Sequence, residues 1–319
     1  MIEKYYDGAI EQVAAGLGTV EKNHLLVRYS GQFSVENLND TKQLEKNEDI
    51  FVQVHEFETG EITCAYEPYL TMICDGFRRY MTGTFEEFME TCDVYYLHRP
   101  VLLGYFNQDN TGREEIILLD EVAYEQERML AALERMLCAI ADRHPVLFVL
   151  NRFQLASKST MQLTARFLKC ENCNIGLVLG VSDIQAMPEF LVPDWEMLYE
   201  TLDDGSKIYH IGNSGRKKEE TIDDEKYVDY GSEKVYRKLQ NMVEFLDFDQ
   251  AAYYLETIER KIKFDNLLVD DAARFRMWLL FVKVSILRQD IPKALEICED
   301  LEKSILPERK RSVHMSRII

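Results

Sequence analysis

Basic residues are scarce in this sequence. Its 319 residues include 37 Lys and Arg against 56 Asp and Glu, which gives a formal net charge of −19. An acidic surface repels phosphate backbones and anionic lipids, so nucleic acids and membrane surfaces are disfavoured as partners. Long apolar runs are also missing, because a segment such as 146–150 falls far short of the ~20 residues that cross a bilayer. Acidic residues at 3, 7 and 11 stand where a secretory signal needs an apolar core. We therefore expect a cytoplasmic protein.

Metal ligands are sparse as well. The seven cysteines and six histidines are scattered, and Cys170 and Cys173 form the one CxxC pair. A structural zinc site takes four ligands, and no second pair stands near this one. We interpret the pair as part of a loop and expect no bound metal. Scattered cysteines in odd number fit a reducing compartment better than a disulfide framework.

The length and the polarity of the chain predict two domains. A single core rarely exceeds about 250–300 residues. Residues 213–232 are polar and charged with few aliphatic side chains, which is typical of a linker. We expect an α/β domain over 1–212, this linker, a helical segment over 233–308, and a tail over 309–319.

Two apolar segments are the strongest strand signals of the first domain. Residues 146–150 read VLFVL and residues 175–181 read IGLVLGV, as strands buried on both faces do. Shorter strand patterns cover 24–30, 50–57 and 207–211, and helical patterns lie between the strands. This alternation predicts a three-layer α/β fold with a parallel sheet.

The helical segment contains two similar stretches. Ala251 and Ala294 each follow an acidic turn, and Trp278 and Pro307 flank the second alanine at helical-hairpin spacing. This pattern resembles the tetratricopeptide repeat, in which two crossing helices need a small residue at their contact. The resemblance implies hairpin repeats that bind a protein or a peptide. A generic helical bundle is the alternative.

Three segments of the first domain carry a second resemblance. They are AYEPYL (65–70), PVLFVLNRFQLASKSTMQLTARFL (145–168) and CNIGLVLGVSD (173–183). Together they resemble the ATPase domains of the STAND class, relatives of AAA proteins that occur in bacterial signalling proteins. The resemblance implies a P-loop NTPase-like sheet, with 145–168 as the Walker B region and 173–183 as the sensor strand.

The ionic residues of such an ATPase site are replaced in this sequence. A P-loop needs two glycines, a lysine and a hydroxyl, but the segment after the first strand reads SGQFSVENL (30–38). Asn151 and Arg152 stand where the family has two acids, and neither can bind Mg²⁺ or activate water as a carboxylate does. The resemblance therefore implies a pseudo-ATPase with no cofactor and no catalytic residue. The vestigial nucleotide site would consist of Gly31, Gln32, Ser34, Glu36, Asn151, Arg152 and Ser182.

A rival pattern keeps catalysis open as an alternative. Residues 115–121 read EIILLDE, in which Asp120 could hold Mg²⁺ and Glu121 could activate water. The same two residues could instead begin the long helix that follows, where acids favour the helix dipole. The chain is thus expected to be a non-catalytic signalling or scaffold module, the N-terminal part of a larger regulator. The alternative is a divergent nucleotide-binding switch or weak ATPase that uses ATP or ADP with Mg²⁺.

Overall fold

The computed structural model divides the chain into two compact units. It describes residues 2–19, 24–29, 33–35, 49–58, 61–109, 121–170, 174–182, 187–203, 207–211, 229–265 and 267–304. Unit 1 comprises Met1–Thr111 and Met129–Lys226, and unit 2 comprises Gly112–Arg128 and Tyr227–Ile319. Most of the expected linker and the whole expected tail lie outside the described residues. None of the described helices combines the length and the apolarity needed to cross a bilayer.

Unit 1 is built on a five-stranded parallel sheet with the order β2-β3-β4-β1-β5. The strands are β1 (Leu25–Tyr29), β2 (Phe51–Glu56), β3 (Val146–Asn151), β4 (Ile175–Ser182) and β5 (Lys207–Ile211). Every residue of β3 and β4 is buried, as expected for central strands with covered faces. The predicted combination of a parallel α/β sheet with a helical segment is confirmed.

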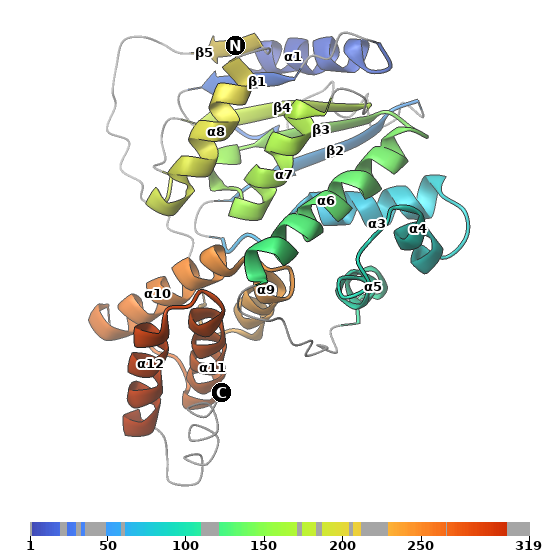
Figure 1. Ribbon diagram of the computed structural model, residues 1–319. Coiled ribbons are helices and arrows are strands. Elements are labelled where there is room, and N and C mark those ends of the chain that lie inside the picture. The colour runs from blue at the N-terminus through green and yellow to red at the C-terminus, as the bar shows by residue number, and fades with distance from the viewer. Residues whose placement is uncertain are drawn as a thin grey trace. The chain divides into compact units, whose positions relative to one another are not determined.

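Helices cover both faces of the sheet (Figure 1). Helix α1 (Ile2–Gly16) places Ile10 and Val13 against Leu147 and Val149 of β3. On the opposite face, Tyr69 of α3 packs edge-on against a β3 phenylalanine, with ring centroids 4.7 Å apart. Adjacent residues of a strand point to opposite faces, so β3 anchors both helical layers.

The other helices of this part follow the sequence pattern closely, with two exceptions. They are α3 (Tyr69–Tyr80), α4 (Phe85–Thr91), α5 (Arg99–Asn107), α6 (Val122–Ala141), α7 (Lys158–Lys169) and α8 (Val192–Asp203). The sequence pattern did not predict α5 and α8. Both carry a proline in their first two positions and are mostly apolar, so their polar and apolar residues give little helical period.

The described residues of unit 2 form four helices, which follow one another as two helical hairpins, and the beginning of α6. They are α9 (Glu233–Glu244), α10 (Phe248–Phe264), α11 (Asp271–Leu287) and α12 (Ile291–Ser304). The Gln126 amide of α6 donates to the carbonyl oxygen of Leu246 at 2.6 Å, within this unit. The first turns of α6 therefore belong with the helical unit, whereas the sequence analysis had placed all of α6 in the α/β domain.

The turns α9–α10 and α11–α12 have the same geometry. Leu246 and Gln289 occupy equivalent places, both in the left-handed region with φ of 64° and 61°. In each turn the next residue is an aspartate, whose N–H donates to the carbonyl five residues back, at 2.7 Å from Asp247 and 2.8 Å from Asp290. This is a common way for helices to end. The two turns are therefore two copies of one structural motif.

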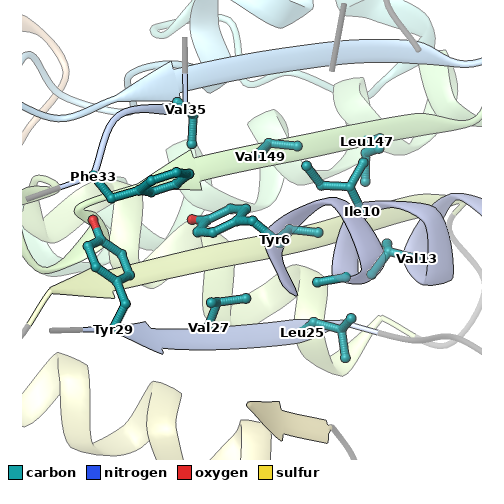
Figure 2. Close-up of a cluster of buried hydrophobic side chains, with 12 residues drawn as sticks. Tyr6, Ile10, Val13, Leu25, Val27, Tyr29, Phe33, Val35, Leu147 and Val149 are labelled. Carbon is teal, nitrogen blue, oxygen red and sulfur yellow. The ribbon is translucent and has the colours of Figure 1, made fainter. Parts of the chain in front are cut away.

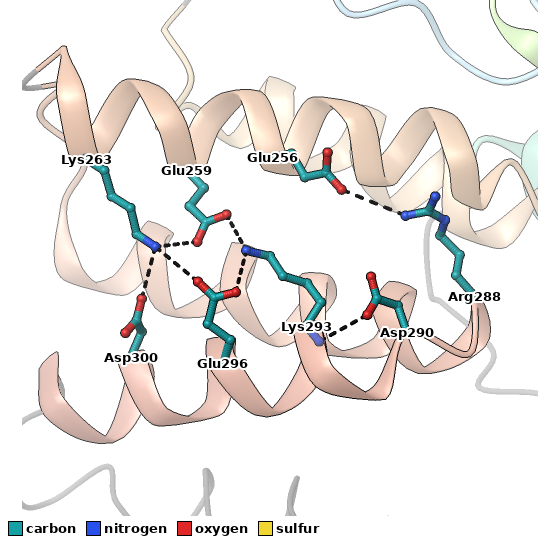
Figure 3. Close-up of polar contacts among 8 residues, drawn as sticks. All are labelled: Glu256, Glu259, Lys263, Arg288, Asp290, Lys293, Glu296 and Asp300. Carbon is teal, nitrogen blue, oxygen red and sulfur yellow. Dashed lines mark hydrogen bonds and ion pairs between the residues drawn. The ribbon is translucent and has the colours of Figure 1, made fainter. Parts of the chain in front are cut away.

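Charged side chains join α10 to α12 (Figure 3). The buried carboxylate of Glu259 accepts from Lys263 at 2.8 Å and from Lys293 at 2.9 Å. The same two lysines reach Glu296, at 3.5 Å and 3.1 Å. Because the Glu259 carboxylate is almost enclosed, water cannot replace the two lysine ammonium groups as its hydrogen-bond partners.

We expect Glu259→Gln to lower the free energy of unfolding by about 1–3 kcal/mol, since it removes a buried charge that two lysines share. The matched control is Glu256→Gln on the same helix. Glu256 is half exposed and lies 3.9 Å from Arg288, so its loss should change stability by less than about 0.5 kcal/mol. Urea unfolding of both variants measures the difference, and equal effects would contradict this account.

Candidate functional site

The candidate site lies at the carboxyl edge of the sheet. Tyr29, Glu56, Asn151 and Ser182 are the last residues of β1, β2, β3 and β4. Because these strands are parallel, all four residues lie at the same edge. Ligands of open α/β sheets bind outside this edge, which makes it the first place to examine.

Asn151 is the hub of the edge. Its side-chain oxygen accepts from the hydroxyl of Tyr29 at 2.7 Å and of Tyr6 at 3.3 Å. Its amide nitrogen donates to the carbonyl oxygen of Phe33 at 3.1 Å. Asn151 is fully buried, so these bonds replace water for both ends of the amide. One side chain thus connects α1, β1, β3 and the segment that follows β1.

Three aromatic rings fill the space beside this hub (Figure 2). The Phe33 ring lies 5.1 Å from the Tyr6 ring and 5.7 Å from the Tyr29 ring, between centroids. Burial raises the pKa of Tyr29 to about 12, and the Glu56 charge adds to this effect while Arg152 opposes it. Both tyrosines therefore stay neutral and act as hydrogen-bond donors at ordinary pH.

Glycine is required at one place in this arrangement. A Cβ atom on Gly180 of β4 would collide with the Tyr6 hydroxyl and would lie 2.6 Å from the side-chain oxygen of Asn151. The absence of a side chain lets the tyrosine reach across the sheet. In the sequence, Gly180 was only part of an apolar strand. The contact between Tyr6 and Asn151 is the reason that this position needs glycine.

Glu56 forms a second polar group at the same edge. One carboxylate oxygen accepts from the Ser34 hydroxyl at 2.7 Å and from the Val35 backbone N–H at 3.1 Å. The other lies 3.3 Å from the guanidinium of Arg152. The Glu56 and Arg152 side chains are 16% and 24% exposed, so water still reaches this pair.

Ser182 is held by a side chain from the segment that follows β3. Its backbone N–H donates to the side-chain oxygen of Gln154 at 3.3 Å, and its carbonyl accepts from the Gln154 amide at 3.0 Å. This paired contact ties the ends of β3 and β4 together.

The structure brings four of the seven residues of the expected vestigial site to this edge. Ser34, Asn151, Arg152 and Ser182 lie there, and Gly31, Gln32 and Glu36 fall outside the described residues. Of the rival pair, Asp120 is likewise not described, and Glu121 is an exposed residue just before α6. Glu121 is thus placed at the beginning of a helix.

The repeat residues lie at matching places in unit 2. Ala251 and Ala294 are buried on α10 and α12, the second helices of the two equivalent hairpins, and Trp278 is buried on α11. Pro307 falls outside the described residues. The 43-residue spacing of the alanines equals that of the left-handed turn residues Leu246 and Gln289.

One acidic group has the spacing of a metal site. The carboxylates of Glu259, Glu296 and Asp300 lie close enough together to share an ion. Lys263 approaches all three, with Asp300 at 3.4 Å, and Lys293 approaches two of them. The ammonium groups already supply the positive charge, so these residues form an ion-pair network.

Three residues of the edge were not among the expected site residues: Tyr6, Tyr29 and Glu56. Tyr29 and Glu56 were expected only as residues of the first two strands, over 24–30 and 50–57. The available signal was the position of Glu56, a carboxylate at the carboxyl end of a parallel strand. The sequence does not tell which groups of the other elements meet it.

The chain matches no protein-family model. No curated protein is similar enough in sequence to count as a relative.

We expect Asn151→Asp to destabilise the protein by about 2–4 kcal/mol, because a buried carboxylate would face the Phe33 carbonyl without a proton to donate. The loss relative to wild type should shrink below about pH 5, where the neutral acid can donate again. The control is Asn107→Asp, the same change at an exposed position. Chemical denaturation at pH 7 and pH 4.5 checks this, and a constant difference between the two pH values would contradict it.

Proposed function

We propose that this chain is a non-catalytic signalling or scaffold module of the cytoplasm. In this proposal, unit 1 is a pseudo-ATPase domain of the STAND type, and unit 2 is a pair of tetratricopeptide-like hairpins that binds a protein partner. The module would form the N-terminal part of a larger regulator.

One observation carries the first half of the proposal. The segment that follows β1, which would cradle phosphates in an active relative, is occupied by contacts with the protein itself. The Phe33 carbonyl is bonded to Asn151, and the Val35 N–H is bonded to Glu56. The Phe33 ring fills the space between two tyrosines. Binding a triphosphate here would require these buried contacts to break.

The electrostatics of the edge point the same way. A magnesium nucleotide needs a carboxylate at the end of β3, and this position holds the neutral side chain of Asn151. The carboxylate of Glu56 is already balanced by Arg152. A triphosphate would therefore meet the Glu56–Arg152 ion pair at the described part of the edge, where a P-loop would offer a lysine.

The order of the strands distinguishes this sheet from two other common α/β sheets. Read from the other edge, it is β5-β1-β4-β3-β2, with β1 between β5 and β4. It differs from the order 3-2-1-4-5-6 of dinucleotide-binding sheets and from the order 2-1-3-4-5 of flavodoxin-like sheets.

We expect the purified protein to bind neither ATP nor ADP in the presence of Mg²⁺. Isothermal titration up to about 1 mM nucleotide should give no heat of binding. The melting temperature should also stay constant, since a bound ligand stabilises the folded state. Saturable binding with a matching rise in melting temperature would contradict the proposal and favour the nucleotide-switch alternative.

The second half of the proposal rests on an exposed face of α12. Ile291 and Leu295 lie one turn apart, 47% and 51% exposed, while the neighbouring Ala294 is buried. Glu299 continues the same face one turn later and is also exposed. An amphipathic helix with an apolar stripe could pack on the two apolar residues of this face. Lysine or arginine beside that stripe would then lie near the acidic residue. We assign this face to such a partner.

We expect a fluorescent helical peptide of leucine and lysine to bind the protein, and Ile291→Asp with Leu295→Asp to weaken binding at least tenfold. The double substitution makes the chain more acidic, so a purely electrostatic attraction would become stronger. The control is Val192→Asp with Met197→Asp, which makes the same change at exposed apolar residues of α8. Fluorescence anisotropy measures both, and equal affinity in the two variants would contradict the assignment.

A further inference from the structure

The contacts of Glu56 have the composition of an anion-binding site. A hydroxyl, a backbone N–H and a guanidinium converge on the two oxygens of one carboxylate, at distances of 2.7, 3.1 and 3.3 Å. These are the donor types with which proteins bind phosphate and carboxylate ligands. The donors come from the segment after β1 and from the residue after β3, whereas the anion comes from β2.

The site lies where an external anion would be expected. All three elements meet at the carboxyl edge of the sheet, the usual place for ligands of α/β folds. The Glu56 side chain is only partly buried, so the donors are close to solvent. We propose that Glu56 is an internal substitute for an oxyanion ligand, and that Ser34, Val35 and Arg152 form an oxyanion site that the protein fills with its own carboxylate.

Tethering explains why the site excludes free anions. A carboxylate attached to the same sheet competes at an effective concentration of millimolar or higher, on the order of what short linkers give. A dissolved phosphate at lower concentration does not displace it. This inference deepens the proposed function, because a self-filled site holds the segment after β1 in place without any external ligand.

Arg152 is the residue that gives the site its charge selectivity. Its backbone lies in the left-handed region, with φ of 52°, and begins the short helical turn after β3. Once Glu56 is removed, the Arg152 guanidinium would have lost its carboxylate, and the contacts that Ser34 and Val35 make with that carboxylate would be lost as well. Donors left without an acceptor bind a replacement anion.

The test is titration of pyrophosphate into four proteins. Wild type should bind it negligibly, Glu56→Ala should bind it at least tenfold more tightly, and Glu56→Ala with Arg152→Gln should lose that gain. Glu58→Ala is the matched control, since it removes the same charge from an exposed position two residues away and should gain nothing. Isothermal titration measures all four, and circular dichroism verifies folding.

A second variant covers the case in which Glu56→Ala does not fold. Glu56→Gln keeps an oxygen for Ser34 and Val35 but removes the charge, and pyrophosphate should then raise its melting temperature more than that of wild type. A folded variant that gains no affinity for pyrophosphate overturns the inference. A gain that survives the Arg152 substitution also overturns it. These outcomes are distinct from magnesium–ATP binding by wild type, which would refute the proposed function.

Discussion

The buried amide of Asn151 is the contact on which the architecture of unit 1 depends. It is bonded to Tyr6 of α1, to Tyr29 of β1 and to the carbonyl of Phe33, and it ends the central strand β3. An amide suits this place because it accepts and donates at once without carrying a charge. A carboxylate could accept from both tyrosines but would repel the carbonyl. Asn151 is therefore the residue that closes the edge.

The two polar groups of the edge have complementary effects. Asn151 and its aromatic neighbours make the interior side dry, and Glu56 with Arg152 balances the charge on the side that water reaches. Both groups hold the same short segment after β1, one through a carbonyl and the other through an N–H. One backbone acceptor and one backbone donor of that segment are both bonded within the protein, so the segment does not need a ligand to keep its conformation.

The sequence predicted the strands well because fully buried strands have few alternatives. VLFVL and IGLVLGV are apolar at every position, which restricts them to the centre of a parallel sheet. It also placed Asn151, Arg152 and Ser182 at one edge through the resemblance. It could not reveal that Tyr6 reaches Asn151, because 145 positions separate them and only the fold brings them together. Helix α8 was missed because its apolar residues lack a clear period.

The long-range contact between Tyr6 and Asn151 also bears on how the chain folds as it leaves the ribosome. Helix α1 packs on β1, β3 and β4, so part of its apolar side remains uncovered until the chain has been synthesised past Ser182. At about 5–20 residues per second, that interval lasts on the order of ten seconds or more. During this time α1 exposes apolar side chains. Molecular chaperones that shield apolar surface would therefore have their greatest effect on this protein in that interval.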